Sequence, residues 1–287
     1  MLPKFKYLRP KNLEEALNLL DKYGEQAKLL AGGTDLIVKM KDRVIEPKYI
    51  IDLSCLKELR FISKENGVIR VGALTTLREI ETSPLIQDHV CVLSDAVGKM
   101  ASWQIRNLGT IGGNLCNASP AADTAPPLLI LEAKLKLNSP EGERIVPVEQ
   151  FFTGPGETIL KNNELLTEIQ IPIIPDNSGA AFLKLGRRAA HTLSIVSVAT
   201  LAIVEDNVFK DVRIALGSVA PTPIRARKTE NKFRGLPATE DVIEENCGCV
   251  MEDINPISDV RASAEYRKEM SIVLTKRALF EALSRVR

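Results

Sequence analysis

Two glycine-rich segments constrain the fold more than any other feature of the chain. The first, Leu29-Leu-Ala-Gly-Gly-Thr-Asp-Leu36, has the pattern of a strand, a Gly-Gly turn and the start of a helix. The second runs from Asn107 to Asp123 and is rich in Gly, Asn, Ser and Thr, with few charges. Turns without side chains let backbone amides approach a ligand closely, and free amides at a helix start favour an anion. Ordering such a polar segment costs conformational entropy, which a bound partner would offset.

Each segment also has a purely structural interpretation. The first would be a strand-to-helix turn capped by Thr34, with Asp35 as a capping or polar-contact carboxylate, because a carboxylate would repel a phosphate. The second would be an Ω-like surface loop. Neither segment has the Gly-x-Gly-x-x-Gly spacing or the Gly-x-x-x-x-Gly-Lys-Ser/Thr spacing, which disfavours a Rossmann or P-loop protein.

Hydrophobic periodicity predicts small α/β units in the first 176 residues. In the first unit we expect a helix over 12–23 behind Asn12, ended by Gly24, and strands over 27–31 and 48–53. In the second we expect a strand over 67–72, helices over 77–80 and 85–100, a helix capped by Asp123 and begun by Pro126-Pro127, and a hairpin over 134–148. Residues 172–178 have the composition of a linker.

Beyond the linker the pattern changes to long apolar strands followed by helices. Strands are predicted over 181–185, 194–204 and 208–217, the last two joined by a turn at 205–207. Helices are predicted over 241–251 and 264–286, the second with one broad apolar face.

Composition limits where metal or redox chemistry could reside. The chain has only two histidines, His89 and His191, and five scattered cysteines, with no Cys-x-x-Cys or His-Glu-x-x-His spacing. This disfavours a zinc site or a protein-held iron–sulfur cluster, so any redox chemistry would need an organic cofactor. With 38 Lys and Arg against 37 Asp and Glu, the net charge of +1 gives no bulk reason to expect nucleic acid or an anionic membrane as partner.

The same features predict a cytoplasmic location. Lys4, Lys6 and Arg9 interrupt the N-terminal residues, so no secretory signal is expected there. The longest uncharged apolar stretch, 192–204, is well short of the roughly 20 residues that span a bilayer, so no membrane span is expected. An odd number of scattered cysteines fits reduced thiols better than a disulfide framework.

Taken together, the motifs resemble those of the FAD-binding medium subunit of the molybdenum hydroxylases, the family of xanthine dehydrogenase and aerobic carbon monoxide dehydrogenase. The resemblance spans almost the whole chain in order. The segments that carry it are Ala31-Gly-Gly-Thr-Asp-Leu36, Gln104-Ile-Arg-Asn-Leu-Gly-Thr-Ile-Gly-Gly-Asn114, Ser119-Pro-Ala-Ala-Asp123, Lys184-Leu-Gly-Arg-Arg188 and Ser263-Ala-Glu-Tyr-Arg-Lys268.

The resemblance implies an α+β chain with an FAD-binding fold of the PCMH/vanillyl-alcohol-oxidase type. Two small α/β subdomains, 1–54 and 55–176, would grip the cofactor between them. A C-terminal flavoprotein domain, 177–287, with a three-stranded antiparallel sheet and helices, would close over the isoalloxazine.

The resemblance also implies the residues that hold FAD, with no catalytic side chain and no metal ligand. Leu29, Leu30, Ala31, Gly32, Gly33, Thr34, Asp35 and Leu36 would wrap the adenosine diphosphate half, with the amides of Gly32 and Gly33 on the pyrophosphate. Thr110, Ile111, Gly112, Gly113 and Asn114 would line the pyrophosphate and ribityl region from the other side, and Ala101 matches a further contact. Asp123 would accept hydrogen bonds from FAD hydroxyls or cap the helix before Pro126. Lys184 and Lys210 match basic positions near the flavin, and Leu193 matches a residue beside the ring.

Several residues keep two interpretations. Cys116 would be a packing residue rather than a redox thiol, and Cys247 and Cys249 would be separate thiols rather than a disulfide or metal pair. His191, in the stretch 190–193 near the expected flavin edge, would be either a functional contact or polar lining. Relatives with an inserted cysteine-rich loop hold a further iron–sulfur cluster, and the corresponding cysteines are absent from this sequence.

The implied function is electron transfer by an FAD-carrying subunit. Substrate would be hydroxylated at a molybdopterin-binding large subunit, electrons would pass through [2Fe–2S] clusters of a small subunit, and FAD would deliver them to NAD+ or another acceptor, in a dimer of heterotrimers. The alternatives are a self-sufficient flavin oxidoreductase with its own substrate pocket and a non-catalytic nucleotide-binding or assembly protein. The hydroxylated substrate and the acceptor are not readable from this chain.

Overall fold

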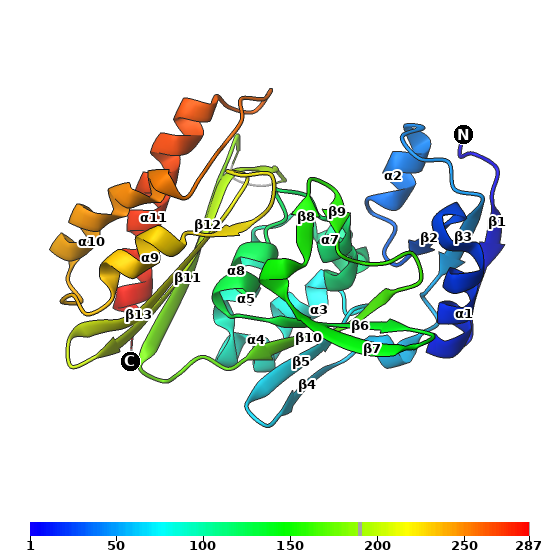
Figure 1. Cartoon of the computed structure of the whole chain (residues 1–287), viewed down its shortest axis with the longest axis horizontal. Coiled ribbons are helices and arrows are strands. Elements are labelled where there is room, and N and C mark those ends of the chain that lie inside the picture. Colours follow the sequence, from blue (N-terminus) through cyan, green and yellow to red (C-terminus); the bar gives the residue numbers. More distant parts are fainter. Residues whose placement is uncertain (189–190, 287) are drawn as a thin grey trace.

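Three main sheets, each of three or more strands, follow one another along the chain in the computed structural model, which describes residues 1–188 and 191–286. Figure 1 shows them side by side, with the N-terminal unit on the right and the C-terminal unit on the left. Each sheet lies within one of the segments 1–54, 55–176 and 177–287. Any site shared by the three units must therefore be formed by the segments between the sheets.

The first sheet is parallel, in the order β1 (Lys6–Leu8), β3 (Tyr49–Asp52), β2 (Ala27–Leu30). Helix α1 (Leu13–Tyr23) crosses between β1 and β2 and buries its apolar residues Ala16, Leu17 and Leu20. Its start was predicted correctly, because the Asn12 side chain accepts a hydrogen bond of 2.9 Å from the Glu15 amide. Its end was also predicted correctly, since Gly24 adopts the left-handed φ of +47°. The 3₁₀ turn η1 (Gly24–Gln26) leads into β2.

Helix α2 (Leu36–Lys41) follows the Gly-Gly turn, but it has no side-chain cap. Asp35 occupies the N-cap position without accepting a helix amide, so the predicted capping role of Thr34 is wrong. The Ile37 amide donates to the Gly33 carbonyl at 3.1 Å, whereas the Leu36 amide at the start of α2 has no acceptor in the described chain and stays available to another partner.

The second sheet has five strands in the order β4 (Ile62–Glu65), β5 (Val68–Gly72), β10 (Leu165–Pro172), β6 (Lys134–Ser139), β7 (Gly142–Pro147). The pairings β4·β5, β5·β10, β10·β6 and β6·β7 are all antiparallel, and β6·β7 is the predicted hairpin. Smaller elements flank the sheet: η2 (Lys57–Leu59), η3 (Val148–Gln150), and the strand pair β8 (Phe152–Gly154) and β9 (Glu157–Thr158).

Six helices belong to the same unit as this sheet, and two predictions about them were wrong. They are α3 (Leu77–Thr82), α4 (Pro84–His89), α5 (Cys91–Gly98), α6 (Trp103–Leu108), α7 (Ile111–Asn117) and α8 (Ala125–Ile130). The predicted single helix over 85–100 breaks at Val90, whose φ and ψ of −146° and 45° are not helical. Asp123 does not cap α8, because Thr124 precedes that helix and no side-chain cap is present.

The second glycine segment is largely helical rather than an Ω-like loop. Ser102 and Thr110 cap α6 and α7 by accepting the amides of Ile105 and Gly113. Gly112 in α7 packs directly on Ala73, where a Cβ atom would lie 2.7 Å from the Ala73 carbonyl oxygen. The low helix propensity of glycine is therefore overridden by close packing that only glycine allows.

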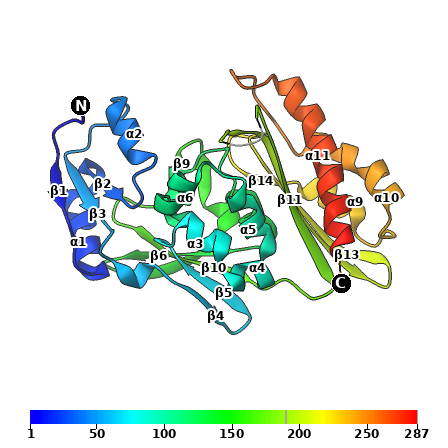
Figure 2. The ribbon, with the colours of Figure 1, turned by 180° about the vertical axis from the view of Figure 1, so that it is seen from behind.

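The third sheet is antiparallel, in the order β11 (Ser178–Gly186), β12 (Ser194–Glu205), β13 (Val208–Gly217), β14 (Ile224–Arg225). The three predicted strands are present, and β14 adds a short fourth that the sequence did not indicate. Helices α9 (Arg227–Phe233), α10 (Glu240–Asn246) and α11 (Ala264–Ser284) and the 3₁₀ helix η4 (Cys247–Glu252) lie on its outer face (Figures 1 and 2). Its inner face meets α5 and α8 of the second unit. Helix α9 was not predicted.

Cys247 of the third unit serves packing. Cys247 is buried in the apolar core between the sheet and its helices, and burial raises the pKa of its thiol to about 12. No disulfide joins cysteines in the described ranges. Within those ranges, no helix is both long and apolar enough to cross a membrane.

The first and second units meet at Gly32. A Cβ atom there would lie 2.0 Å from the Leu108 carbonyl oxygen and 2.9 Å from the Cα of Gly109, both of which belong to the backbone. Because neither can move like a side chain, the glycine is required for the two loops to touch.

We expect Gly32→Ala to lower the free energy of unfolding by at least about 1–3 kcal/mol, the usual cost of overpacking. Urea unfolding followed by circular dichroism measures the change. The matched control is Gly248→Ala, because a Cβ atom at Gly248 meets nothing within 4 Å. Equal stability of the two variants would contradict the contact.

Candidate functional site

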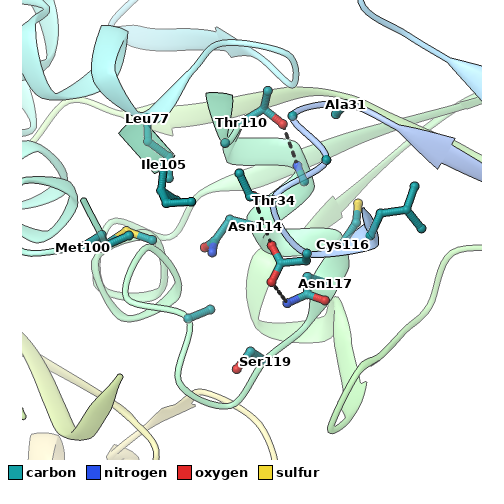
Figure 3. Close-up of a pocket in the computed structure, with 18 of the residues that line it drawn as sticks. Ala31, Thr34, Leu77, Met100, Ile105, Thr110, Asn114, Cys116, Asn117 and Ser119 are labelled. Carbon is teal, nitrogen blue, oxygen red and sulfur yellow. Dashed lines mark hydrogen bonds between the residues drawn. The ribbon is translucent and has the colours of Figure 1, made fainter. Parts of the chain in front are cut away.

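A cavity of about 780 Å³ lies where loops of all three units meet (Figure 3). This volume is within the range of about 300–1,000 Å³ that small-molecule sites occupy. Most of the predicted residues line it: Leu29, Ala31, Gly32, Gly33, Thr34, Asp35, Leu36, Ala101, Thr110, Gly113, Asn114, Asp123, Lys184 and Leu193. Four do not, namely Leu30, Ile111, Gly112 and Lys210.

The turn between β2 and α2 forms the first wall and offers hydrogen-bond donors. The amides of residues 33–36 donate to no acceptor within the described part of the chain. Gly33 has a φ of +72°, which points successive amides toward one side of the turn. Lys28 and Lys39 line the same region. Free amides and two ammonium groups together suit an anion such as a pyrophosphate.

Leu30 lies under this turn rather than on the cavity wall. Its Cδ1 atom would be 3.1 Å from a Cβ atom at Gly33, so it supports the turn from within the protein. Leu29 and Ala31, on either side of Leu30 in the sequence, line the cavity, whereas Leu30 does not.

Helix α7 forms the second wall. The Thr110 hydroxyl accepts the Gly113 amide at 3.1 Å, and Asn114 Oδ1 accepts the Thr124 hydroxyl at 2.6 Å. The Asn114 Nδ2 group donates to no acceptor in the described chain. It is therefore available to a ligand.

Ile111 and Gly112 face away from the cavity, contrary to the prediction. Their amides donate to the carbonyl oxygens of Thr75 and Ala73 at 3.1 and 2.9 Å, and both residues are buried. These bonds dock the first turn of α7 on the second sheet. The amides are consequently occupied and cannot bind a phosphate.

A polar chain joins the two walls. Asn117 Nδ2 donates to Asp35 at 3.1 Å (Figure 3). Lys39 Nζ donates to Asn117 Oδ1 at 2.7 Å. Asp35 is thus a polar-contact carboxylate, as one interpretation of the sequence held. Asn117 lies inside the second glycine segment, and its polar neighbours were the signal that could have found it.

Asp123 links the third unit to the cavity. It is 4% exposed, and its carboxylate accepts hydrogen bonds from Lys184 Nζ at 2.6 Å and from the Ser194 hydroxyl. Lys184 also donates to the Lys99 carbonyl at 3.2 Å. Burial raises the pKa of Asp123 above its ordinary value, while Lys184 and Ser194 favour its charged form. The pair fastens β11 and β12 to the loop before α8.

The end of the cavity beside Asp123 is lined by residues 191–193. Leu193 is 60% exposed although it is apolar, and His191 lines the wall with its carbonyl held by Arg188 at 2.7 Å. Ala101 also lines the cavity, and its φ of +40° lies in the left-handed region. Residue 190, part of the predicted flavin-edge stretch, lies outside the described residues.

Lys210 lies far from the cavity. It pairs with the exposed Glu205 at 2.6 Å, at the hairpin end of β13. Gly217, seven residues further along that strand, is the part that approaches the cavity loop at Pro120. At about 3.3 Å per residue the separation is on the order of 23 Å. The predicted flavin contact of Lys210 is therefore not supported.

Sequence reasoning missed part of the lining. The additional residues come from the same polar segments and from apolar positions between them: Leu77, Met100, Ser102, Ile105, Gly109, Cys116, Asn117, Ser119, Ala121, Ala122, Gly156 and Thr192, beside Lys28, Lys39 and Ile45. His191, for which the sequence left a functional contact or polar lining open, also lies on the wall. Cys116 is open to the cavity, but desolvation by the surrounding protein raises the pKa of its thiol to about 12. It stays protonated, which fits a lining residue better than a redox thiol.

The chain matches family models over nearly its whole length. Residues 3–174 match the model described as FAD binding domain in molybdopterin dehydrogenase. Residues 181–282 match the CO dehydrogenase flavoprotein C-terminal domain. The chain belongs to the FAD-binding medium subunits of the molybdenum hydroxylase family. The α+β fold and the FAD cofactor expected from the sequence are thereby confirmed.

Individual medium subunits agree with this assignment. The chain is 37% identical to the putative xanthine dehydrogenase FAD-binding subunit of Escherichia coli, covering 97% of this chain and 96% of the relative. It is 35% identical to the glyceraldehyde dehydrogenase medium chain of Sulfolobus acidocaldarius, over 97% and 98% of the two chains. A solved structure of carbon monoxide dehydrogenase from Hydrogenophaga pseudoflava superposes with a TM-score of 0.97 at 34% identity, covering both chains fully. This medium subunit is thus part of a molybdenum-containing dehydrogenase.

The cavity of this medium subunit fits FAD on its own chemistry. The unpaired amides of residues 33–36 suit the pyrophosphate, and the hydroxyl and amide groups of Thr110 and Asn114 suit the polar linker. Apolar Leu193, Ile105 and Met100 suit a flat ring. Among the described residues, no cluster of three or more His, Cys, Asp or Glu could hold a metal ion.

We expect Asp123→Ala to destabilise this medium subunit by about 3–5 kcal/mol, because it leaves the Lys184 ammonium, whose side chain is 6% exposed, without its counter-ion. The double variant Asp123→Ala/Lys184→Met should recover much of that loss. Urea unfolding of Asp123→Ala, Lys184→Met and the double variant measures the coupling. Additive losses would show that the two groups do not interact.

Proposed function

We propose that this chain carries FAD as an electron-transfer relay, taking electrons from [2Fe–2S] clusters of a small subunit and passing them to NAD+ or another acceptor. The observation that carries the proposal is the composition of the cavity wall. It offers amides, hydroxyls and apolar groups, and its one buried carboxylate, Asp123, is engaged by Lys184 and Ser194. Such a wall suits the binding and orientation of a cofactor, which would carry the redox chemistry.

The flavin would supply the redox chemistry, since its ring takes up and releases electrons. The residues of this chain would hold the cofactor, orient it and shield its ring. The 33–36 turn would hold the pyrophosphate, Thr110 and Asn114 would orient the linker, and Leu193 would limit access of water to the ring.

The partners are inferred from what the relatives are called. Relatives described as medium chains imply a large and a small subunit beside this one. We propose that the large subunit binds molybdopterin, that the small one holds [2Fe–2S] clusters, and that two heterotrimers associate.

A cytoplasmic location is supported by the absence of a disulfide among the cysteines of the described chain. The division at 54/55 and 176/177 is supported by the confinement of each sheet to one segment.

Purification separates this proposal from its alternatives. We expect a yellow preparation with releasable FAD that co-purifies with two other chains. A yellow protein that oxidises a substrate alone would support a self-sufficient flavin oxidoreductase. A colourless chain that takes up no FAD on reconstitution would support an assembly protein and overturn the relay.

The glycine of α7 tests the cofactor assignment. A Cβ atom at Gly113 would lie 2.9 Å from the Thr110 hydroxyl and 4.0 Å from the Ala31 Cβ, in the space between the two walls. We expect Gly113→Val to weaken FAD binding at least about tenfold, or roughly 1.4 kcal/mol, measured by fluorescence titration of the apoprotein.

Gly98→Val is the matched control for that titration, because Gly98 also lies in a helix and its nearest new contact is an ordinary 3.7 Å. Both variants should keep the helical content of the parent chain. Unchanged FAD affinity in Gly113→Val would contradict the placement of FAD between the walls.

The NAD+ part of the proposal has its own test. Anaerobic titration of the purified complex with NADH should bleach the flavin absorption if NAD+ is the acceptor, because the electron path runs in both directions. Absence of bleaching in a yellow complex would reject NAD+ and leave another acceptor.

A further inference from the structure

We propose that Arg267, which does not line the cavity, is a positioning residue that holds the C-terminal wall of the FAD site in place; the inference rests on the proposed binding of FAD. Arg267 lies in the first turn of α11 and is 2% exposed. Its Nη1 group donates to the carbonyl oxygens of Ile195 at 2.6 Å and Ser218 at 2.9 Å, and its Nη2 group donates to Asp259 at 2.8 Å. One guanidinium therefore joins β12, the end of β13 and the segment before α11.

The two carbonyls stand at the points where the third sheet touches the cavity loop. Ile195 follows Ser194, whose hydroxyl donates to Asp123, and Leu193 on the same strand end lines the cavity. The Ser218 amide donates to the Pro120 carbonyl at 2.8 Å. Arg267 thus fixes both attachments of the sheet to residues 119–123, several of which line the cavity.

Ser218, which forms one of these attachments, is held in a backbone conformation that residues with side chains disfavour. Its φ of +66° is in the left-handed region, which costs a residue with a side chain on the order of 1 kcal/mol or more. Its amide is held by Pro120 and its carbonyl by Arg267, so both neighbours maintain that conformation. Removal of Arg267 would free the carbonyl and let the strand end relax away from the loop.

Asp259 keeps the guanidinium in position. Its Oδ1 atom also accepts the Arg261 amide at 2.8 Å and the Ala262 amide at 3.3 Å. Although burial opposes its charge, these amides and Arg267 lower the pKa of Asp259 to about 2, so the pair stays charged at neutral pH. A guanidinium can serve two carbonyls and a carboxylate in one plane, whereas the ammonium of a lysine acts as a compact point charge.

Arg285 on the same helix provides the matched control. It donates to the Ala180 carbonyl and to Asp95, both at 2.9 Å, so it too fastens α11 and the sheet to the second unit. Of its partners, Ala180 lies at the start of β11 and Asp95 lies in α5, and Arg285 does not line the cavity. Figure 2 shows α11 running along the sheet between these regions. Loss of either arginine should lower stability, but only loss of Arg267 should disturb the cofactor.

The experiment compares Arg267→Gln, Arg267→Lys and Arg285→Gln in the purified FAD-loaded protein with its partners. FAD release is followed by the rise of flavin fluorescence, and flavin exposure by iodide quenching of the bound cofactor. We expect Arg267→Gln to release FAD about tenfold faster than the parent and to show stronger quenching. The FAD release rate and the quenching of Arg267→Lys should lie between those of the parent and those of Arg267→Gln. The FAD release rate of Arg285→Gln should stay within about twofold of the parent, although its unfolding midpoint should be lower.

Equal release rates and quenching in Arg267→Gln and Arg285→Gln would overturn the positioning role and leave Arg267 as a general stabilising residue. If Arg267→Gln does not fold, Arg267→Lys decides by the same comparison with Arg285→Gln. If the parent protein holds FAD and the Arg267 variants behave like Arg285→Gln, only the positioning role of Arg267 is rejected. A parent that binds no FAD rejects the proposed function and this inference with it.

Discussion

The cavity depends on one buried ionic contact, the pair of Asp123 and Lys184 with the Ser194 hydroxyl. Isolated charges are costly to bury, so each partner is acceptable only because the other is within hydrogen-bond distance. Asp123 belongs to the loop before α8, whereas Lys184 and Ser194 belong to the third sheet. The contact therefore binds the C-terminal unit to the FAD-binding units at the place where the cavity needs its third wall.

The glycines that suggested a ligand also have structural duties. Gly32 and Gly112 are required because backbone atoms of Leu108 and Ala73 occupy the space a side chain would need. Gly33 and Gly113 instead face the cavity, with Gly33 giving the turn its left-handed step. The same two segments thus satisfy two requirements, close packing between the units and close approach of the backbone to the cofactor. Both requirements favour glycine, which explains why it is concentrated there.

Local signals predicted much of the fold. The Asn12 cap, the Gly24 stop, the β6–β7 hairpin and the long strands of the third sheet follow from side-chain chemistry and periodicity within a few residues. The errors occurred where distant contacts decide the outcome. Helix α7 forms in a glycine-rich segment because the carbonyls of residues 73 and 75 receive its first amides, and Asp123 serves a lysine 61 residues away rather than the helix that follows it.

The sequence by itself determined the family, the cofactor class and about half of the cavity lining, because the two glycine motifs are contiguous and each carries its chemistry locally. Only the tertiary structure decided which members of each motif face the cavity, since of the neighbouring residues Leu29 and Leu30 only Leu29 lines it. It also showed that Lys210 lies at the far end of its strand and that Arg267, near the end of the chain, supports the wall beside Asp123. These are relations between residues distant in sequence, and the packing of the three units sets them.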